Sequence, residues 1–287
     1  MSAVPERSRL ALHGTIAPAM STDLIDTHAH LQLAPFDPDR SAVLERAATA
    51  GVARMIEVGY DLESSRAACT LAEQHSTMFA VVGIQPHYAA QADAAWLTTI
   101  RQLASHPKVV AIGEIGLDYY HDRAPHDQQE WLFREQLALA RDLGKPVVIH
   151  TREAQADTLR ILYDAARGQQ GIMHSFSGDW AYAEACLGLD FFLSFSGPVT
   201  FPRATALHEV ARRAPLERIL TETDSPYLSP HPLRGKRNEP ARVRLIAEQL
   251  ASLRGSNLET IASRVWENAC RVFGLPASNQ TPPGSDA

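Results

Sequence analysis

Short apolar runs alternate along the chain with longer segments in which apolar residues recur at helical spacing. The runs, rich in β-branched and aromatic residues, are Asp23–Asp26, Arg54–Val58, Phe79–Gly83, Val109–Gly113, Pro146–Ile149, Gly171–Met173, Phe191–Phe195 and Arg218–Thr221. Helices are predicted at about 39–50, 63–75, 93–105, 127–143, 153–167, 178–188, 203–213 and 240–272, with a break in the last at Gly255–Ser256. Eight such repeats, whose strands are too apolar for one-sided exposure, predict buried parallel strands.

This alternation predicts an α/β fold, and a single-domain (β/α)₈ TIM-type barrel over residues 21–275 fits the eight repeats best. An open, doubly wound parallel sheet is the alternative. Asp39 and Asp93 stand where helix N-caps are expected, and Gly51 and Gly144 stand where helices end. Residues 1–20 lack clear periodicity and are predicted to form a flexible extension. Residues 276–287, rich in Pro, Ser, Gly and Asn, are predicted to form a disordered tail.

The charge balance excludes a protein that coats nucleic acid through a strongly basic surface. The 287 residues include 27 basic and 33 acidic side chains, which give a net charge of −6, so any nucleic-acid contact has to be local. Three dispersed cysteines without a CxxC pair indicate a reducing compartment. No apolar run approaches the roughly 20 residues of a membrane span. We therefore expect a cytoplasmic protein without membrane association, and the sequence leaves its oligomeric state open.

Side chains that can bind metal follow the apolar runs at their carboxyl ends. They are His28 and His30 after the first run, Glu114 after the fourth, His150 after the fifth, His174 after the sixth and Asp224 after the eighth. In a barrel these ends meet at the face that carries active sites. His28 and His30 are two residues apart, so both imidazoles project to the same side of an extended backbone. Glu114 would be costly to bury unless it were paired or metal-bound.

The mixture of imidazole and carboxylate ligands suits Zn²⁺, Mn²⁺, Co²⁺ or Mg²⁺. Six candidate ligands exceed the three that usually hold a single catalytic zinc, so we expect two or more divalent ions that share a carboxylate. The sequence contains no glycine-rich phosphate loop, dinucleotide fingerprint or nucleophile elbow. A metal-activated water is then the expected nucleophile, and hydrolysis the expected chemistry.

Several motifs resemble those of the TatD family of metal-dependent deoxyribonucleases, which belongs to the amidohydrolase-like barrels. The motifs are Asp26–Leu31, Gly83–His87, Ala111–Tyr119, Ile149–Ala154, His174–Gly178, Thr221–Leu228 and Arg237–Pro240. They occur in order from about Leu24 to Phe273. The resemblance implies a TIM-type barrel, divalent metal ions such as Mg²⁺, Mn²⁺ or Zn²⁺ as cofactor, and a 3′–5′ exonuclease acting on single-stranded DNA, with a part in DNA repair or apoptotic degradation.

The resemblance also assigns roles to the six residues. His28 and His30 are implied to bind one ion, Glu114 to be shared between ions, and His150 and His174 to be further ligands. Asp224 is implied to be a ligand that also orients or deprotonates the attacking water. Glu114 and Asp224 are therefore the expected catalytic residues.

Substrate contacts are expected from residues near the same face. Arg152 follows His150 by two residues and could hold a phosphate, although a solvent-exposed arginine at a helix start is an equal alternative. The basic residues Arg234, Lys236 and Arg237 follow the eighth run and are expected to clamp the DNA backbone. Tyr119 and Tyr120 could stack a base or pack on the barrel edge.

Three features depart from the family pattern. Gln85 replaces a histidine that is implied, like His87, to contact substrate; glutamine can donate a hydrogen bond but cannot carry charge or transfer a proton. Ser175 stands where relatives have cysteine, and residues 1–20 have no counterpart.

Gln85 keeps open a hydrolase of another bond, such as a D-aminoacyl-tRNA deacylase, a lactonase or an amidohydrolase. A non-catalytic nucleic-acid-binding relative is the remaining alternative. Glu57 is expected to form a salt bridge within the barrel.

Overall fold

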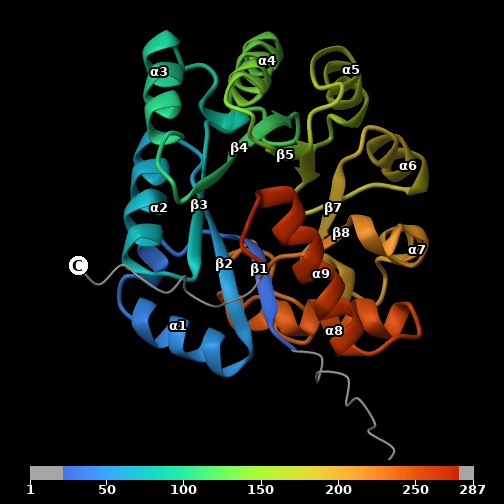
Figure 1. Ribbon diagram of the computed structural model, residues 1–287. Coiled ribbons are helices and arrows are strands. Elements are labelled where there is room, and N and C mark those ends of the chain that lie inside the picture. The colour runs from blue at the N-terminus through green and yellow to red at the C-terminus, as the bar shows by residue number, and fades with distance from the viewer. Residues whose placement is uncertain (1–21, 278–287) are drawn as a thin grey trace, which may run out of the picture.

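Eight parallel strands form one sheet in the computed structural model, which describes residues 22–277 (Figure 1). They are β1 (Leu24–Ala29), β2 (Val52–Val58), β3 (Met78–Val82), β4 (Val109–Asp118), β5 (Val147–Arg152), β6 (Gly171–Met173), β7 (Phe192–Phe195) and β8 (Ile219–Thr221). Each strand pairs in parallel with the next in sequence order. An isolated parallel bridge joins Ala29 to Ser225, just beyond β8, so the sheet is a nearly closed barrel. The barrel is confirmed, and the open sheet is excluded.

Helices cover the outside of the barrel between the strands (Figure 1). The α-helices are α1 (Arg40–Thr49), α2 (Leu62–Gln74), α3 (Ala94–Leu103), α4 (His126–Asp142), α5 (Gln155–Ala165), α6 (Trp180–Gly188), α7 (Thr205–Arg213), α8 (Val243–Leu253) and α9 (Leu258–Phe273). Short 3₁₀ turns are η1 (Ala34–Phe36), η2 (Pro86–Tyr88), η3 (Gly197–Thr200), η4 (Leu216–Arg218) and η5 (Pro240–Arg242). The predicted break in the last helix is confirmed, because Gly255, with φ 59°, separates α8 from α9.

Two predicted N-caps have different outcomes. The Asp93 carboxylate accepts hydrogen bonds from the backbone N–H groups of Ala95 and Trp96, which are unpaired donors at the start of α3. Asp39 precedes α1 but makes no side-chain cap bond. Its carboxylate instead binds the Arg237 guanidinium, with both oxygen-to-nitrogen distances 2.8 Å. An ion pair with a residue far along the chain has taken the place of the local cap.

Close backbone approach explains Gly113, within β4, and Gly83, which directly follows β3. A Cβ atom on Gly83 would lie 2.6 Å from the carbonyl of Gly113, and one on Gly113 would lie 2.7 Å from Cβ of Val148. Any larger residue would force the strands apart. The surrounding core is apolar, with fully buried side chains such as Ile112 and Phe192. Glycine is therefore needed at these two positions, where the backbones near the ends of β3, β4 and β5 lie close together.

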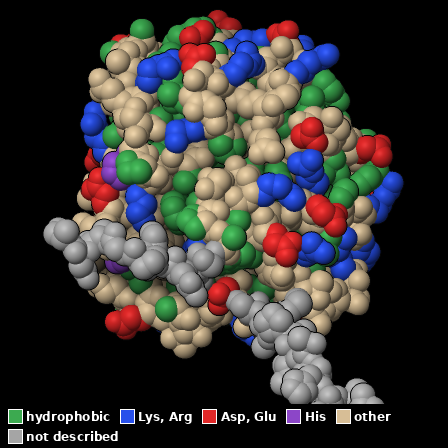
Figure 2. All heavy atoms as spheres, in the orientation of Figure 1, with side chains coloured by type: hydrophobic (Ala, Val, Ile, Leu, Met, Phe, Trp, Pro, Cys, Tyr) green, Lys and Arg blue, Asp and Glu red, His purple; other side chains and the backbone are tan. Residues whose placement is uncertain are grey.

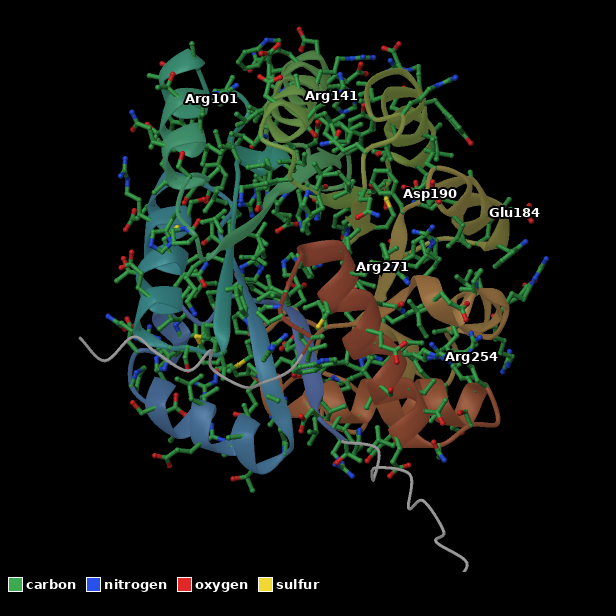
Figure 3. The ribbon with its side chains drawn as sticks, viewed as in Figure 1. Arg101, Arg141, Glu184, Asp190, Arg254 and Arg271 are labelled. Atoms are coloured by element: carbon green, nitrogen blue, oxygen red, sulfur yellow. The ribbon has the colours of Figure 1, made fainter. Side chains whose placement is uncertain are left out.

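The opposite end of the barrel carries basic side chains with structural partners. The guanidinium groups of Arg141 and Arg271 (Figure 3) donate to the carbonyls of Ala165 and Glu217. A cavity of about 650 Å³ opens beside these two arginines. Figure 2 shows acidic and basic side chains interspersed on the face seen in this orientation. These arginines satisfy backbone carbonyls near helix ends, which stabilises the fold.

Both predicted terminal extensions lie outside the described residues except at Pro276 and Ala277. The carbonyl of Pro276 accepts a hydrogen bond from Arg54 at 2.6 Å, and that of Ala277 accepts one from Trp266 at 3.1 Å. The packed part of the chain thus continues to Ala277. Between residues 22 and 277, no helix has the length and apolar character needed to cross a bilayer.

Candidate metal centre

The end of β1 places His28 and His30 beside the segment that follows β8. The N–H of Asp224 donates to the carbonyl of His28 at 2.8 Å, and the N–H of His30 donates to the carbonyl of Ser225 at 2.9 Å. Both imidazoles are buried, and their Nε2 atoms lie 3.2 Å apart. The two-residue spacing has therefore brought both rings to one side, as predicted.

The hydrogen bonding of His30 fixes which of its nitrogens faces the site. Nδ1 lies 2.7 Å from the carbonyl oxygen of Val58, and because a carbonyl only accepts, Nδ1 carries the hydrogen. Nε2 lies 3.3 Å from Oδ1 of Asp224. In a neutral ring this places a lone pair against a carboxylate oxygen, an arrangement that requires a cation or a proton between them. The donor set therefore fits a metal ion at this position.

His150, on β5, is held in a similar way. Its Nε2 lies 3.0 Å from Oδ2 of Asp118, and its Nδ1 lies 2.8 Å from Oε1 of Glu114. Burial lowers the pKa of His150, but its contacts with Asp118 and Glu114 outweigh burial and raise the pKa to about 9. Asp118 is thus the outer carboxylate that orients a candidate ligand.

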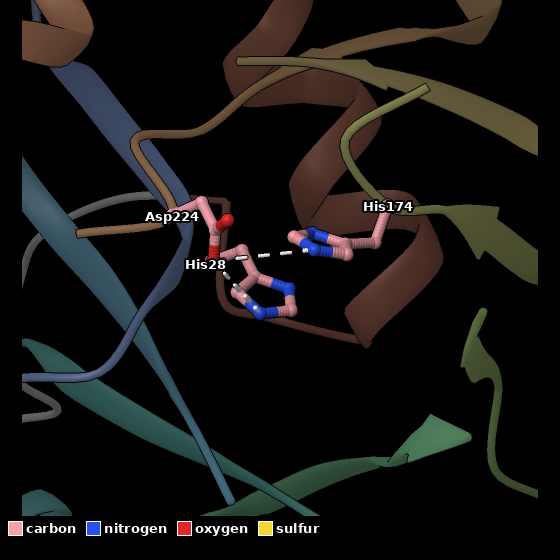
Figure 4. Close-up of side chains that lie close together, drawn as sticks. All are labelled: His28, His174 and Asp224. Carbon is pink, nitrogen blue, oxygen red and sulfur yellow. Dashed lines mark ion pairs between the residues drawn. The ribbon is translucent and has the colours of Figure 1, made fainter. Parts of the chain in front are cut away.

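His174 follows β6 and has its own outer carboxylate in Glu222. Nδ1 of His174 lies 2.7 Å from Oε1 of Glu222, while Nε2 lies 3.8 Å from Oε1 of Glu114 and 4.0 Å from Oδ1 of Asp224. The His174 ring stacks on that of His28, with centroids 3.6 Å apart (Figure 4). Burial lowers the pKa of His174, but the charge of Glu222 and the neighbouring carboxylates raise it to about 10.

Glu114 lies between two groups of histidines. Its Oε2 is 3.8 Å from Nε2 of His28, and its Oε1 contacts His150 and His174. Burial raises the pKa of Glu114, but the hydrogen bond from His150 and the charges of the other histidines hold it well below its ordinary value. The candidate ligand atoms of His28, His30 and Glu114 lie within 4.8 Å of one another, as do those of Glu114, His150 and His174. A shared carboxylate between two donor sets fits two divalent ions.

Asp224 completes a third overlapping set with His28 and His174, whose candidate ligand atoms also lie within 4.8 Å of one another (Figure 4). Asp224 has φ 55°, a left-handed conformation that Asp tolerates better than most residues. Asp26, which is fully buried on β1, accepts from the N–H of Thr223 at 2.8 Å and from its hydroxyl at 2.5 Å. This pairing ties β1 to the segment that presents Asp224.

The structure therefore brings together all six residues predicted as ligands. The partners that orient them, Asp118, Glu222 and Asp26, were not predicted, although each lies inside one of the family-like motifs. Glu57 was expected to form a salt bridge, but within residues 22–277 it makes none. Its Oε1 accepts from the N–H of Gln32 at 3.1 Å, and burial raises its pKa to about 8.

Gln85 and His87 are connected to the metal centre by way of Asp118. Nε2 of His87 is 2.9 Å from Oδ2 of Asp118, and the side-chain amide of Gln85 is 3.1 Å from Nδ1 of His87. The contact between Arg152 and Tyr120, with the guanidinium 4.2 Å from the ring centroid, borders this region. Tyr120 is exposed, and its ring also makes an edge contact with that of His121, with centroids 4.9 Å apart.

Other predicted contact residues are engaged elsewhere. Tyr119 stacks on His126, with centroids 3.7 Å apart, and donates to Asp157 at 3.1 Å, so it packs on the barrel edge. Arg237 is held by Asp39. Arg234 lies over the Phe201 ring, 4.4 Å from its centroid. Of the predicted basic clamp, Arg237 is therefore committed to an ion pair.

Comparison with known proteins gives one consistent result. The family described as TatD related DNase matches residues 25–274. The uncharacterized metal-dependent hydrolase YabD of Bacillus subtilis is 44% identical, over 88% of this chain and 99% of that protein. The 3′-5′ ssDNA/RNA exonuclease TatD of Pantoea ananatis is 38% identical, over 88% of this chain and 100% of that protein. The crystal structure of the TatD homologue YJJV from Escherichia coli superposes with a TM-score of 0.83 at 32% identity, covering 90% of this chain and 100% of that one.

Proposed function

This chain belongs to the TatD family of metal-dependent hydrolases, and we propose that it hydrolyses phosphodiester bonds of DNA, working from the 3′ end of single strands. The single observation that carries the proposal is Glu114, which lies between two sets of histidines at the carboxyl ends of the strands. Two cations bridged by one carboxylate can hold both the attacking and the leaving oxygen of an in-line displacement at phosphorus.

We propose that the two sites take Mg²⁺, Mn²⁺ or Zn²⁺. His28, His30, Glu114 and Asp224 would hold one ion, and Glu114, His150 and His174 the other. When bound, such ions lower the pKa of water and neutralise charge on the phosphate. The outer contacts of His30, His150 and His174 leave one nitrogen of each ring directed at the centre, so the ligands are oriented before any ion arrives.

Asp224 is the residue best placed to accept the proton of the attacking water. Its Oδ1 faces His30 and His28 at 3.3 and 3.9 Å, inside the centre. Its side chain keeps some exposure, unlike those of His28 and Asp26, so water can reach it. Glu114, which is more buried and lies between the donor sets, has the bridging role.

The strand would cross the rim on either side of this centre. Tyr120 and Arg152 offer an aromatic face and a cation beside β4 and β5, and single strands bind through such pairs by stacking and charge. Arg234 and Lys236 lie in the segment after β8 and would contact backbone phosphates. A role in DNA repair and a cytoplasmic location accompany this proposal.

Gln85 favours one second candidate, a hydrolase of another ester such as a D-aminoacyl-tRNA. Its amide contacts His87 and cannot supply a charged or proton-transferring group to a phosphodiester. An ester with a better leaving group would not need one.

The test uses metal-free protein supplied with Mg²⁺, Mn²⁺ or Zn²⁺ and single-stranded DNA labelled at its 3′ or its 5′ end. The proposal expects metal-dependent release of mononucleotides from the 3′ end, and no release by the matched variant Glu114→Gln, which keeps the shape of the side chain but removes its charge. Hydrolysis of an aminoacyl ester without hydrolysis of DNA would instead establish the second candidate.

A further inference from the structure

One oxygen of Asp118 meets three imidazoles. Its Oδ2 lies 2.8 Å from Nδ1 of His121, 2.9 Å from Nε2 of His87 and 3.0 Å from Nε2 of His150. The other oxygen, Oδ1, accepts from the backbone N–H groups of Tyr120 and His121 at 3.0 and 2.8 Å. The side chain is fully buried. Three imidazole nitrogens and two backbone N–H groups therefore lie within hydrogen-bonding distance of one buried carboxylate.

Counting acceptor sites shows that Oδ2 is crowded. A carboxylate oxygen offers two lone pairs, and Oδ1 has used both of its own on backbone groups. If all three rings donated an N–H to Oδ2, one hydrogen would lack an acceptor. His150 needs its hydrogen on Nε2, because its Nδ1 faces Glu114 in the metal centre. One lone pair of Oδ2 thus remains for both His87 and His121.

We propose that His87, Asp118 and His121 form a further cation site, separate from the Glu114 centre, in which Nε2 of His87, Oδ2 of Asp118 and Nδ1 of His121 bind a divalent ion of the Zn²⁺ type. A cation uses the last lone pair of Oδ2 and the lone pairs of both rings at once. These three atoms all lie within 4.8 Å of one another. Two imidazoles and a carboxylate are a donor set that zinc accepts.

The distances require only a small expansion. Tetrahedral zinc with bonds of roughly 2.0–2.1 Å needs ligand atoms about 3.3 Å apart, whereas the two imidazole nitrogens lie 2.8 and 2.9 Å from Oδ2. The His150 to Glu114 contact in the main centre is equally short, at 2.8 Å. His121 lies on the turn after β4 and its side chain is 35% exposed, so it can move outward and admit an ion from solvent.

Gln85 gives the site an outer partner. Ligation through Nε2 of His87 places the hydrogen on Nδ1, which then needs an acceptor. The Gln85 amide lies 3.1 Å from that Nδ1, and a half-turn of the amide presents Oε1 in place of the NH₂ group. A histidine at position 85 would have to present an unprotonated nitrogen to do the same, whereas glutamine always carries an acceptor.

The geometry around Asp118 favours a cation. Three imidazole nitrogens lie within 3.0 Å of its Oδ2, so an ion bound there would have imidazole ligands and an outer partner already in place. Open coordination positions would face the rim beside His121 and Tyr120, where a substrate phosphate or water could bind. Ion binding at this site does not depend on whether the enzyme hydrolyses DNA.

The test counts bound zinc on the full-length protein. Metal-free protein is titrated with Zn²⁺ by calorimetry, and bound zinc is measured by elemental analysis after gel filtration. We expect about three equivalents for the wild type and about two for His121→Ala. The matched control His126→Ala removes another exposed histidine, whose partner is the exposed Asp122, and should still bind three.

Two results would overturn the site: a His121→Ala variant that binds as many equivalents of zinc as the wild type, or the loss of one equivalent from both variants. Thermal melting establishes that both variants fold. Absence of DNA hydrolysis with three bound ions would refute the proposed function and leave this site standing.

Discussion

Nε2 of His150 lies 3.0 Å from Oδ2 of Asp118, and this contact determines that Nδ1, not Nε2, faces Glu114. The carboxylate acts on the metal centre through the ring, without touching the centre itself. Asp118 is therefore a positioning residue, and the main effect of removing it should be weaker metal binding.

Replacing Asp118 with asparagine should weaken binding of the ion that Glu114, His150 and His174 would hold by about 10–100-fold, the usual effect of losing an outer partner of a metal-binding histidine. Competition with a chromogenic chelator measures this affinity. Asp122→Asn, which changes an exposed carboxylate on the same loop, is the control. Equal affinities for Asp118→Asn and the wild type would show that His150 is oriented by something else.

Glu114→Ala should lower metal content and abolish turnover. In the proposed centre Glu114 would bind and neutralise two cations, and its loss leaves His28 and His150 without a common partner. The barrel should stay folded, as near-ultraviolet circular dichroism can establish. Elemental analysis that found unchanged stoichiometry in this variant would contradict the bridging role.

Substituting Arg234 and Lys236 together with alanine should weaken binding of single-stranded DNA uniformly across sequences. Each lost phosphate contact should reduce the slope of log affinity against log salt by about 0.7. Fluorescence anisotropy at several salt concentrations gives the slope. The matched control replaces Arg66 and Arg212, which lie exposed on α2 and α7. The same slope in both double variants would place the DNA track elsewhere.

Gln85→His should raise the rate of DNA hydrolysis. A histidine can donate a charge-assisted hydrogen bond, roughly twice as strong as a neutral one, or transfer a proton to the leaving oxygen. General acid catalysis typically contributes about 10²–10⁴-fold, so a gain of at least about tenfold is expected in steady-state assays. A rate that stays flat or falls would instead indicate that Gln85 serves His87 or a different substrate.

Glu57→Gln should reduce the dependence of stability on pH. Burial raises the pKa of Glu57 from 4.5 to about 8, so between these values the folded protein holds a proton that the unfolded chain has released. This carboxyl group therefore makes the free energy of unfolding fall as pH rises, by about 1.4 kcal/mol per unit. Urea denaturation at several pH values should show that the free energy of unfolding of the variant falls less steeply with pH, by about 1.4 kcal/mol per pH unit, which corresponds to one proton. An unchanged slope would mean that Glu57 is ionised in the folded state.

The barrel, and the gathering of the six candidate ligands at one face, could be predicted because both depend on local patterns. Strand and helix periods repeat eight times, and His28, Glu114 and Asp224 each follow an apolar run directly. A parallel barrel brings such positions to one face whatever the details of packing. Neither prediction required knowledge of which side chains touch.

The outer partners could not be predicted, because they depend on distances between remote residues. Glu222 was visible as a carboxylate two residues before Asp224, but nothing in the sequence shows that it meets His174, 48 positions earlier along the chain. Asp39 was assigned to a helix cap on local grounds and instead binds Arg237. In each case a tertiary contact decides between roles that the local sequence allows equally.

The hydrogen bonds between the end of β1 and the segment after β8 place the metal centre on the seam where the barrel closes. His28 and His30 leave the ribosome nearly two hundred residues before Asp224 does. The early histidines cannot share an ion with Asp224 until almost the whole chain has been synthesised and the last strand has docked. Metal loading therefore reports on completed folding: a truncated or stalled chain that lacks the region around Asp224 cannot assemble the full centre.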